Sequence, residues 1–259
     1  GDATTLTQYR ALAGKLGYDP VVVEGVFTPL RLVKTEAEIA KLREAARVTD
    51  LAYEAALAVM KPGVMEVEVA LELERAMRLN GAEGSAFDII VASGVRGAMP
   101  HGVASQKRLA AGELVTLDFG AVVDGYHADM TRTVAIGEVG AEERRLFDAV
   151  LEAQQAALDA VAPGRSGREV DQVARDVLGE HGLADAFTHS LGHGTGLVIH
   201  EGPRLSHRSD DVLQPGMVVT VEPGVYFPGF TGLRIEDLVV VTEEGREVLS
   251  KSPKAFRSL

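Results

Sequence analysis

Residues 112–120 read GELVTLDFG, and residues 216–224 read GMVVTVEPG at a shift of 104 positions. Both segments are apolar, rich in β-branched residues and closed by a Gly, which is typical of a buried strand. Each carries one carboxylate at the same position, Asp118 in the first and Glu222 in the second. A carboxylate inside an apolar strand is costly unless a cation or hydrogen-bond donors lie nearby, so the pair indicates a site as well as a repeat.

The helical segments that precede these strands repeat as well, at a shift of 101 positions. A further small slip sets Asp129 opposite Glu236, each in a β-branched apolar segment. Chance matching of Ala-rich helices is the alternative, but the joint agreement of helix ends and strands favours an internal duplication. We therefore expect one domain with two similar halves around a pseudo-twofold axis. The matching helix positions are Pro62 and Pro163, Gly63 and Gly164, Glu68 and Glu169, Val69 and Val170, and Gly81 and Gly182.

Apolar periodicity and turn residues place the secondary structure along the chain. Thr35, with Glu38 three positions on, predicts a helix start, and Pro62 ends that helix. Asp124 and Gly125 are the preferred pair for a two-residue turn between two strands. We expect helices at residues 6–16, 35–62, 67–79, 141–161 and 167–178, and strands at residues 21–23, 114–123, 126–136, 217–225 and 233–241.

Composition excludes several classes of protein. With 259 residues, 46% hydrophobic and 25% charged, the chain is typical of a globular protein with one large core. The net charge of -12 argues against a general nucleic-acid binder. Cysteine is absent, so any metal must be held by His, Asp or Glu. We see no apolar run of about 18 residues and no secretory leader, and expect a cytoplasmic protein without a membrane partner.

The first hairpin brings two carboxylates together. If its turn has two residues, Asp118 lies opposite Thr131 and diagonal to Asp129, so that both carboxylates are on the same face. Diagonal neighbours lie about 7–8 Å apart at the backbone, close enough to share cations. The duplicated half supplies Glu222 and Glu236. Four strand carboxylates that converge across a pseudo-twofold axis predict a dinuclear metal site.

Histidines cluster in one glycine-rich stretch. Residues 188–203 read THSLGHGTGLVIHEGP, in which His189, His193 and His200 are separated by 4 and then 7 positions. The glycines beside His193 allow the backbone to approach a site closely. His101, on a loop in the sequence MPHG, is a fourth candidate, and His127 shares the strand parity of Asp129 and so is expected on the same face.

Simpler explanations and other motifs compete with a metal site. Each acid could cap a turn or pair with Arg132 or Arg234, and this alternative stays open. The residues after His200 lack a second His at the spacing of helical zinc proteases, and Pro203 interrupts a helix there. Nucleophile elbows, P-loops and dinucleotide fingerprints do not occur. His181 stands at a predicted helix end, where a cationic side chain suits the helix dipole, and is interpreted as structural.

Five ordered motifs are similar to those of the pita-bread metallopeptidases, and specifically of their Xaa-Pro branch, aminopeptidase P and prolidase. They are LDFG at 117–120, DMTRT at 129–133, GHGTG at 192–196, VEPG at 221–224 and LRIED at 233–237. The resemblance spans residues 36–259. It implies an α+β fold with two pseudo-symmetric halves of helices and antiparallel strands around a curved sheet. Arg234, two positions before Glu236, and His189, four before His193, resemble the Xaa-Pro enzymes more than methionine aminopeptidases.

The resemblance also implies a site and a reaction. The reaction is hydrolysis of the bond before proline in Xaa-Pro dipeptides or longer peptides, by a homodimer. It needs two divalent ions, and manganese, cobalt and zinc all suit oxygen ligands with one imidazole. The implied metal ligands are Asp118, Asp129, His193, Glu222 and Glu236. The implied substrate-binding residues are His101, His189, His200 and Arg234.

The mechanistic hypothesis assigns a role to each group. A hydroxide that the metal generates near neutral pH attacks the carbonyl before proline. His200 stabilises the oxyanion, Glu222 relays a proton to the leaving nitrogen, and His101 is a further catalytic candidate. Two alternatives remain, a methionine aminopeptidase-like peptidase and a catalytically inactive binding module with the same fold.

The first residues resemble a different part of the family's architecture. Residues 1–35 are similar only to the tail of the amino-terminal domain that these enzymes usually carry, and residues 36–259 correspond to the catalytic domain. In the family, the amino-terminal domain helps to build the dimer and to close the substrate cleft. We therefore expect residues 1–35 to be a remnant and linker, which leaves substrate length and oligomeric state open.

Overall fold

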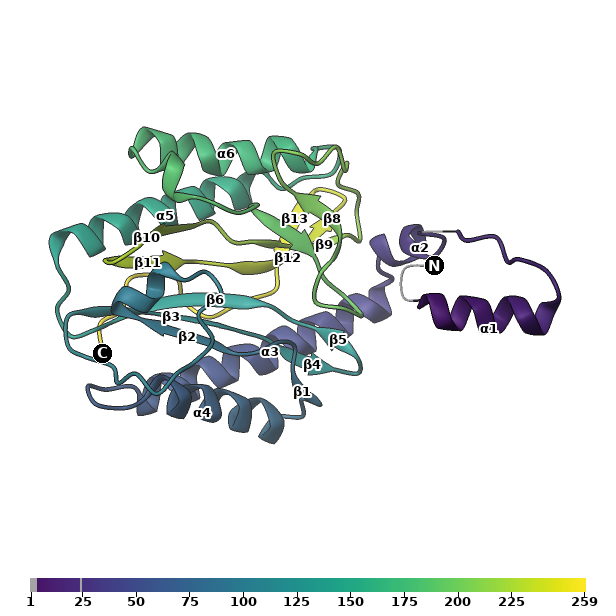
Figure 1. Cartoon of the computed structure of the whole chain (residues 1–259). Coiled ribbons are helices and arrows are strands. Elements are labelled where there is room, and N and C mark those ends of the chain that lie inside the picture. The colour runs from purple at the N-terminus through teal and green to yellow at the C-terminus, as the bar shows by residue number, and fades with distance from the viewer. Residues whose placement is uncertain (1–3, 24) are drawn as a thin grey trace.

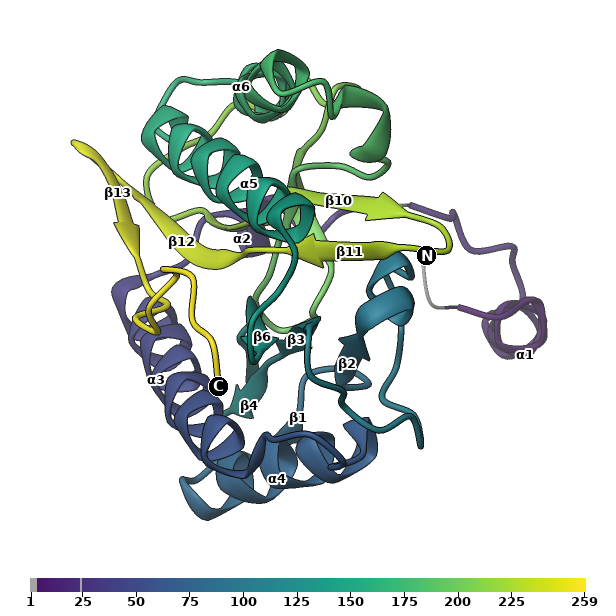
Figure 2. The same ribbon diagram turned by 90° about the vertical axis from the view of Figure 1, so that its left-hand side faces the viewer.

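Two pairs of helices enclose a layer of strands in the computed structural model, which describes residues 4–23 and 25–259. The helices are α1 (Leu6–Leu16), α2 (Thr28–Leu32), α3 (Glu36–Val59), α4 (Glu66–Leu79), α5 (Ala141–Ala160) and α6 (Gly167–Glu180). Two short 3₁₀ turns are η1 (Gly94–Ala98) and η2 (Ala184–Ala186). Figures 1 and 2 show α5 and α6 on one side of the strands and α3 and α4 on the other.

The main helices begin where their capping residues predict. The Thr35 hydroxyl accepts a hydrogen bond from the Glu38 backbone N–H, and the Glu38 carboxylate accepts one from the Thr35 N–H. Ser166 and Glu169 form the same reciprocal box at the start of α6. Such boxes satisfy backbone donors that a helix start leaves free. The predicted helices at residues 6–16, 35–62, 67–79, 141–161 and 167–178 are thus confirmed to within a few residues.

The strands form two bent hairpins and their short neighbours. They are β1 (Gly84–Ser85), β2 (Ile90–Ser93), β3 (Glu113–Phe119), β4 (Ala121–Val123), β5 (Tyr126–His127), β6 (Met130–Ile136), β7 (Gly192–Gly194), β8 (Glu201–Leu205), β9 (Val218–Val221), β10 (Gly224–Phe227), β11 (Thr231–Arg234), β12 (Asp237–Thr242) and β13 (Gly245–Val248). Three strands pair in the order β2-β3-β6, and five pair in the order β13-β12-β9-β7-β8.

The first hairpin has the predicted register but is not continuous. Asp124 and Gly125 adopt positive φ angles of 48° and 77° between the paired residues Val123 and Tyr126, which confirms the two-residue turn. The predicted strand at residues 114–123 is divided at Gly120, where a Cβ atom would lie 1.8 Å from the Ala128 carbonyl oxygen. This close crossing bends the hairpin, so that β4 pairs with β1 rather than extending the sheet of β3.

The second hairpin repeats this design. β9 pairs with β12 and β10 pairs with β11 in one common register, with a break between them on each strand. The breaks fall at Glu222 and Pro223 on one strand and at Ile235 and Glu236 on the other. A carboxylate at a break is free of the pleat alternation, so it can turn toward the other half of the molecule.

The apolar core follows the duplication. One buried cluster joins α5 and α6 to the second hairpin through residues such as Leu146 and Leu233. Another joins α3 and α4 to the first hairpin through residues such as Leu73 and Phe119. Burial of each such side chain stabilises the fold by about 1.5–3 kcal/mol. Within residues 4–23 and 25–259, none of the helices is both long and apolar enough to cross a bilayer.

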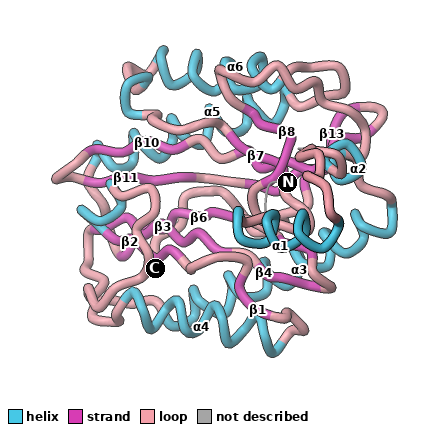
Figure 3. The backbone as a smooth tube through the Cα atoms, turned by 45° about the vertical axis from the view of Figure 1, so that its right-hand side comes forward, coloured by secondary structure: helices cyan, strands magenta, loops and turns pink. Residues whose placement is uncertain are grey.

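The segment before α3 differs from the rest of the molecule. Figure 3 shows α1 in front of the body and joined to it by an extended connection. The predicted strand at residues 21–23 is wrong, because Val21, Val22 and Val23 pair with no strand among the described residues and are exposed. A strand needs a partner edge, and none lies beside this run. Residues 1–3 and 24, which belong to the predicted remnant, lie outside the described residues.

Candidate metal centre

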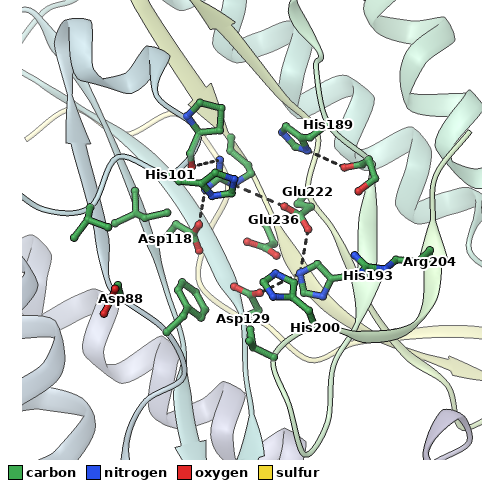
Figure 4. A pocket seen from close by; sticks show the side chains of 17 residues that line it. Asp88, His101, Asp118, Asp129, His189, His193, His200, Arg204, Glu222 and Glu236 are labelled. Atoms are coloured by element: carbon green, nitrogen blue, oxygen red, sulfur yellow. Dashed lines mark hydrogen bonds and ion pairs between the residues drawn. The ribbon is translucent and has the colours of Figure 1, made fainter. Parts of the chain in front are cut away.

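A cavity of about 500 Å³ opens between the two halves of the molecule (Figure 4). Nine of its lining residues carry the acidic, imidazole and guanidinium groups that the sequence singled out. They are His101, Asp118, Asp129, His189, His193, His200, Glu222, Arg234 and Glu236. The structure therefore brings together all nine residues predicted to bind metal or substrate, although they come from separate loops and strands.

The hairpin breaks position the carboxylates. Asp118 lies opposite Thr131 in the register of β3 and β6, as predicted, and Asp129 stands directly before β6. Glu236 stands directly before β12 in the other half. One carboxylate oxygen each of Asp118, Asp129 and Glu236 lies within 4.8 Å of the others. Three buried acids at such separations have the geometry of a shared cation site.

These acids have unsatisfied oxygen atoms. Asp118 Oδ1, Asp129 Oδ1 and Glu236 Oε1 are buried without a hydrogen-bond partner among the described residues. Buried polar atoms normally have partners, and several orphans at one point call for a bound group. Burial, followed by the charges of Glu236 and Asp118, raises the pKa of Asp129 well above its ordinary value. Because positive charge would offset this penalty, the residues fit divalent cations.

His193 is arranged as a neutral ligand. Its Nδ1 atom is 3.0 Å from the Gly194 carbonyl oxygen, so that Nδ1 carries the proton and Nε2 presents a lone pair. Nε2 lies 3.4 Å from Glu222 Oε1 and 3.6 Å from Asp129 Oδ2. Burial lowers the pKa of His193 to about 4, so the ring is neutral at neutral pH. His193, Glu222 and Asp129 thus form a second group of candidate metal ligands beside the cluster of Asp118, Asp129 and Glu236.

Glu222 lies between the two halves of the site. The Thr220 hydroxyl donates to its Oε1 at 2.9 Å, and its Oε2 is 4.0 Å from Arg234 Nε. Burial raises the pKa of the Glu222 carboxyl to about 7, although the charge of Arg234 opposes the shift. The pKa of Glu236 is also raised, by burial and then by the charges of Glu222 and Asp118.

Arg234 holds the floor of the cavity. It donates to Asp118 Oδ2, to the Tyr226 hydroxyl at 2.7 Å and to the Thr131 hydroxyl at 3.1 Å. The simpler alternative is therefore partly realised, because Arg234 does pair with one of the acids. Asp118 Oδ1 nevertheless stays without a partner, so the pairing does not satisfy the cluster. Arg132 pairs with Asp237 instead of with a site acid.

The histidines occupy different walls. Figure 4 shows His101 on the Asp118 side, and the ring centroid of His200 is 4.3 Å from that of His193. Both ring nitrogens of His189 are engaged, with the Ser190 carbonyl at 2.8 Å and the Tyr226 hydroxyl at 2.9 Å. His189 therefore contacts substrate only if one of these bonds opens.

Two other histidines lie elsewhere. His127 is outside the cavity lining, because its ring turns to the Gly196 carbonyl oxygen at 3.2 Å, and the expectation that it shares the site face is wrong. The hairpin bend after β5 alters the parity that this expectation assumed. His181 forms the C-cap of α6 and lies 2.8 Å from a Glu152 carboxylate oxygen. This position agrees with its interpretation as a structural residue.

Sequence reasoning missed several groups in and around the cavity. Arg204 lines it and is exposed, and Tyr226 links His189 to Arg234 beneath it. Thr131 donates to Glu236 Oε2 at 2.6 Å. Tyr226 and Thr131 could have been singled out from the sequence, since each lies within four positions of an acid in one of the motifs. No local sequence pattern marks Arg204, because it reaches the cavity from β8 through strand pairing with His193.

The fold and the cluster together define a class, a metal-dependent peptidase built from two pseudo-symmetric halves. The model of metallopeptidase family M24 matches residues 40–243, and the chain belongs to this family. This match, together with similar structures of an Xaa-Pro dipeptidase and a prolidase, confirms the pita-bread fold and the resemblance to its Xaa-Pro branch.

Several proteins are similar to this chain over most of its length. An uncharacterized peptidase, YqhT, of Bacillus subtilis is 50% identical over 96% of this chain and 70% of its own length. An Xaa-Pro dipeptidase of Pyrococcus furiosus is 46% identical over 90% of this chain and 67% of its own length. The structure of an Xaa-Pro dipeptidase from Bacillus anthracis superimposes with a TM-score of 0.98 at 50% identity, over 100% of this chain and 73% of that one. The chain thus spans about two thirds to three quarters of the length of these relatives.

Proposed function

We propose that this chain hydrolyses Xaa-Pro dipeptides at the bond before proline, with two divalent ions in the cavity. The main support for this proposal is the group of carboxylate oxygens without hydrogen-bond partners on Asp118, Asp129 and Glu236. Oxygens of these three residues lie within 4.8 Å of one another. Membership of a metallopeptidase family and the two relatives named Xaa-Pro dipeptidase support the same reaction.

The proposed metal ligands are five residues from both halves: Asp118, Asp129, His193, Glu222 and Glu236. Four carboxylates and one neutral imidazole suit manganese, cobalt or zinc. Bound divalent ions would supply a nucleophile at neutral pH and polarise the substrate carbonyl. The contribution of the chain is to hold the ligand atoms. Thr220 fixes Glu222 and Thr131 fixes Glu236 through short hydrogen bonds.

The remaining polar groups would orient the substrate. His200, beside His193, is placed to donate a hydrogen bond to the carbonyl oxygen as it becomes negative. Glu222 lines the cavity, with its Oε2 4.0 Å from Arg234 Nε, and would carry a proton to the proline nitrogen as the C–N bond breaks. His101 lies on the opposite wall as a second hydrogen-bonding group. Arg234 and His189 act from beneath, through the Tyr226 hydroxyl.

Arg204 favours a dipeptide over a longer peptide. Arg234 is buried and committed to Asp118 and Tyr226, whereas Arg204 is exposed in the cavity and no ion pair of the described residues involves it. A free guanidinium is well suited to a terminal carboxylate, which a dipeptide presents directly after the proline ring. We therefore propose that Arg204 binds the carboxylate of the proline residue.

The exposed amino-terminal segment supports a contact with another polypeptide. Leu6, Val21, Phe27 and Leu30 are each more than half exposed, and patches of this kind mark interfaces. We propose that residues 1–35 lie outside a catalytic unit of residues 36–259 and contribute to a homodimer. Light scattering after size-exclusion chromatography tests this, since a monomer at micromolar concentration would contradict it.

The function is tested by metal-dependent cleavage. The protein is dialysed against chelator, reloaded with Mn²⁺, Co²⁺ or Zn²⁺, and assayed on Leu-Pro, Leu-Pro-Gly and Met-Ala. We expect cleavage of Leu-Pro only with metal, and slower cleavage of Leu-Pro-Gly. Cleavage of Met-Ala alone would instead support a methionine aminopeptidase. Metal binding without cleavage of any peptide would support an inactive binding module.

The role of Arg204 has its own test. Arg204→Met should raise the KM for Leu-Pro by about 10-fold or more, because a charge-assisted hydrogen bond is worth about 1.5–3 kcal/mol. The KM for Leu-Pro-amide, which lacks the carboxylate, should not change. Arg208→Met, at an exposed position outside the cavity lining, is the matched control. Equal effects on both substrates would exclude carboxylate recognition.

A further inference from the structure

A buried carboxylate outside the cavity ties down the loop that carries His101. Glu66 is the first residue of α4 and is 0% exposed. Its Oε1 accepts hydrogen bonds from the Ser93 N–H at 2.9 Å and hydroxyl at 2.8 Å. Its Oε2 accepts from the Ser105 N–H at 3.1 Å and hydroxyl at 2.6 Å, and from Arg96. Both oxygens are thus fully used.

These donors are the two ends of one loop. Ser93 ends β2 and Ser105 lies twelve positions on, so Glu66 closes a loop of residues 94–104 that contains η1 and His101. Arg96 extends the closure, because its Nη2 also donates to the Val103 carbonyl oxygen at 2.8 Å. One carboxylate therefore fixes the start, the first turn and the end of the loop.

The far side of the same loop contacts the floor of the cavity. Arg234 Nη1 donates to the Pro100 carbonyl oxygen at 3.3 Å, and Arg234 also contacts Asp118. His101 directly follows Pro100, so its position depends on both attachments. Among the described residues, the strand pairing of the loop is limited to one bridge between Ile90 and Val103, and the backbone of Gly97 packs against Gly232 of β11. The side-chain contacts of Glu66 and Arg234 are therefore the main attachments on either side of the imidazole.

The second half of the duplication shows that helix packing does not require this carboxylate. Under the 101-residue shift, the counterpart of Glu66 is Gly167, at the start of α6. A Cβ atom at Gly167 would lie 2.0 Å from the Arg204 carbonyl oxygen, so the second half places backbone where the first half places a buried charge. Burying a carboxylate costs several kcal/mol unless donors offset it. The first half retains it where the adjoining loop carries a cavity residue.

We propose that Glu66 is a positioning residue, which acts on Xaa-Pro hydrolysis through the loop of residues 94–104 and His101. This inference rests on the proposed function, because it requires His101 to contact the substrate. Glu66 does not touch the five proposed metal ligands. Its loss should therefore leave metal content unchanged and reduce turnover only through the imidazole.

The test is a double-mutant cycle between Glu66→Gln and His101→Ala. The glutamine amide would point a donor at Ser105 and Arg96, which are donors themselves, so the loop end should open. We expect kcat/KM for Leu-Pro to fall between about 10-fold and 100-fold, since small displacements of catalytic groups have effects of this size. Metal content, measured by plasma mass spectrometry, should not change. In the His101→Ala background, the same substitution should have no further effect.

The outcomes separate this inference from the function on which it rests. If His101→Ala alone leaves turnover intact, the proposed role of His101 is wrong. If it lowers turnover but Glu66→Gln is fully additive with it, Glu66 does not act through His101 and the inference is overturned. Ser105→Ala, which removes one donor and leaves the charge paired, should show a smaller effect with the same non-additivity if Glu66→Gln does not fold. Glu72→Gln, on the same helix but paired with Arg75 rather than with the loop, is the control.

Discussion

Two clusters of buried charge meet at adjacent residues, and they differ in how completely they are satisfied. Glu236 belongs to the cavity cluster, and its Oε1 has no partner among the described residues. The next residue, Asp237, is bonded through both oxygens, to Arg132 Nη2 at 2.7 Å and to Gln154 and Lys254 at 2.9 and 2.6 Å. Both side chains are almost completely buried, so exposure does not distinguish them, whereas their hydrogen-bond partners do.

This difference separates structure from function. Burial works to raise the pKa of the Asp237 carboxyl, but the charges of Arg132 and Lys254 outweigh it and hold that pKa below its usual value. Burial, followed by the charges of Glu222 and Asp118, raises the pKa of Glu236 well above its usual value, and the charge of Arg234 offsets only part of this shift. A satisfied cluster needs no further partner to stay buried, whereas an unsatisfied one is complete only with a bound cation.

The largest effect is expected from removing a carboxylate of the unsatisfied cluster. Asp118→Ala deletes one of the three converging oxygens and leaves Arg234 without its acidic partner. We expect loss of metal binding together with a decrease in Leu-Pro hydrolysis of more than about 10³-fold, which is about 4 kcal/mol of transition-state stabilisation. Isothermal titration with Mn²⁺ and initial rates measure the two losses. An active variant without bound metal would disprove the metal scheme.

The satisfied cluster should respond in stability instead. Asp237→Ala leaves Arg132, which is 2% exposed, without its ion-pair partner. Breaking a buried pair in this way costs about 3–5 kcal/mol of unfolding free energy. Glu236→Gln is the matched variant one position away, and in metal-free protein it should cost much less because it relieves repulsion with Asp129. Urea unfolding measures the free energy of unfolding of both variants. Equal decreases in this free energy would contradict the distinction between the two clusters.

Metal removal tests the same distinction without mutation. Cations that bind only the folded state add about 2.7 kcal/mol of stability when their free concentration is 100 times the Kd. We expect the Tm of the wild-type protein to fall on dialysis against chelator and to recover with Mn²⁺. Asp118→Ala should show neither change. A wild-type Tm that does not respond to metal would mean that the orphaned oxygens are satisfied in another way.

Much of the fold could be predicted because local and global signals agree. Thr35 and Glu38 predict a helix start wherever they stand, and Asp124 and Gly125 predict a turn whose register then places Asp118 opposite Thr131. The internal duplication of the sequence then predicts the second hairpin. The break in the first hairpin could not be predicted, because it depends on the close crossing of Gly120 with Ala128, a contact between strands.

Only those cavity residues that belong to a local sequence motif could be predicted. The acids follow from strand motifs, and His193 follows from its glycine-rich stretch. Arg204 and Glu66 reach their places through tertiary contacts with segments far along the chain, which no local pattern records. His127 was misplaced for the same reason, because its ring turns to the Gly196 carbonyl oxygen, which lies far along the chain.

The smallest effect is expected at Thr131, which joins the two clusters. Its hydroxyl donates to Glu236 Oε2 at 2.6 Å and its carbonyl oxygen accepts from Arg132 Nη1 at 2.9 Å. Thr131→Val keeps the carbonyl and the shape but removes the hydroxyl, which leaves Glu236 Oε2 and Arg234 Nε without this partner, so unfolding free energy should fall by about 1–3 kcal/mol. Metal affinity should fall about 10-fold, as for other residues that orient a ligand. Thr133→Val, on the same strand and bonded to the Arg234 carbonyl, controls for loss of a buried hydroxyl. Equal losses of metal affinity in the two variants would show that Thr131 acts through general packing rather than through Glu236.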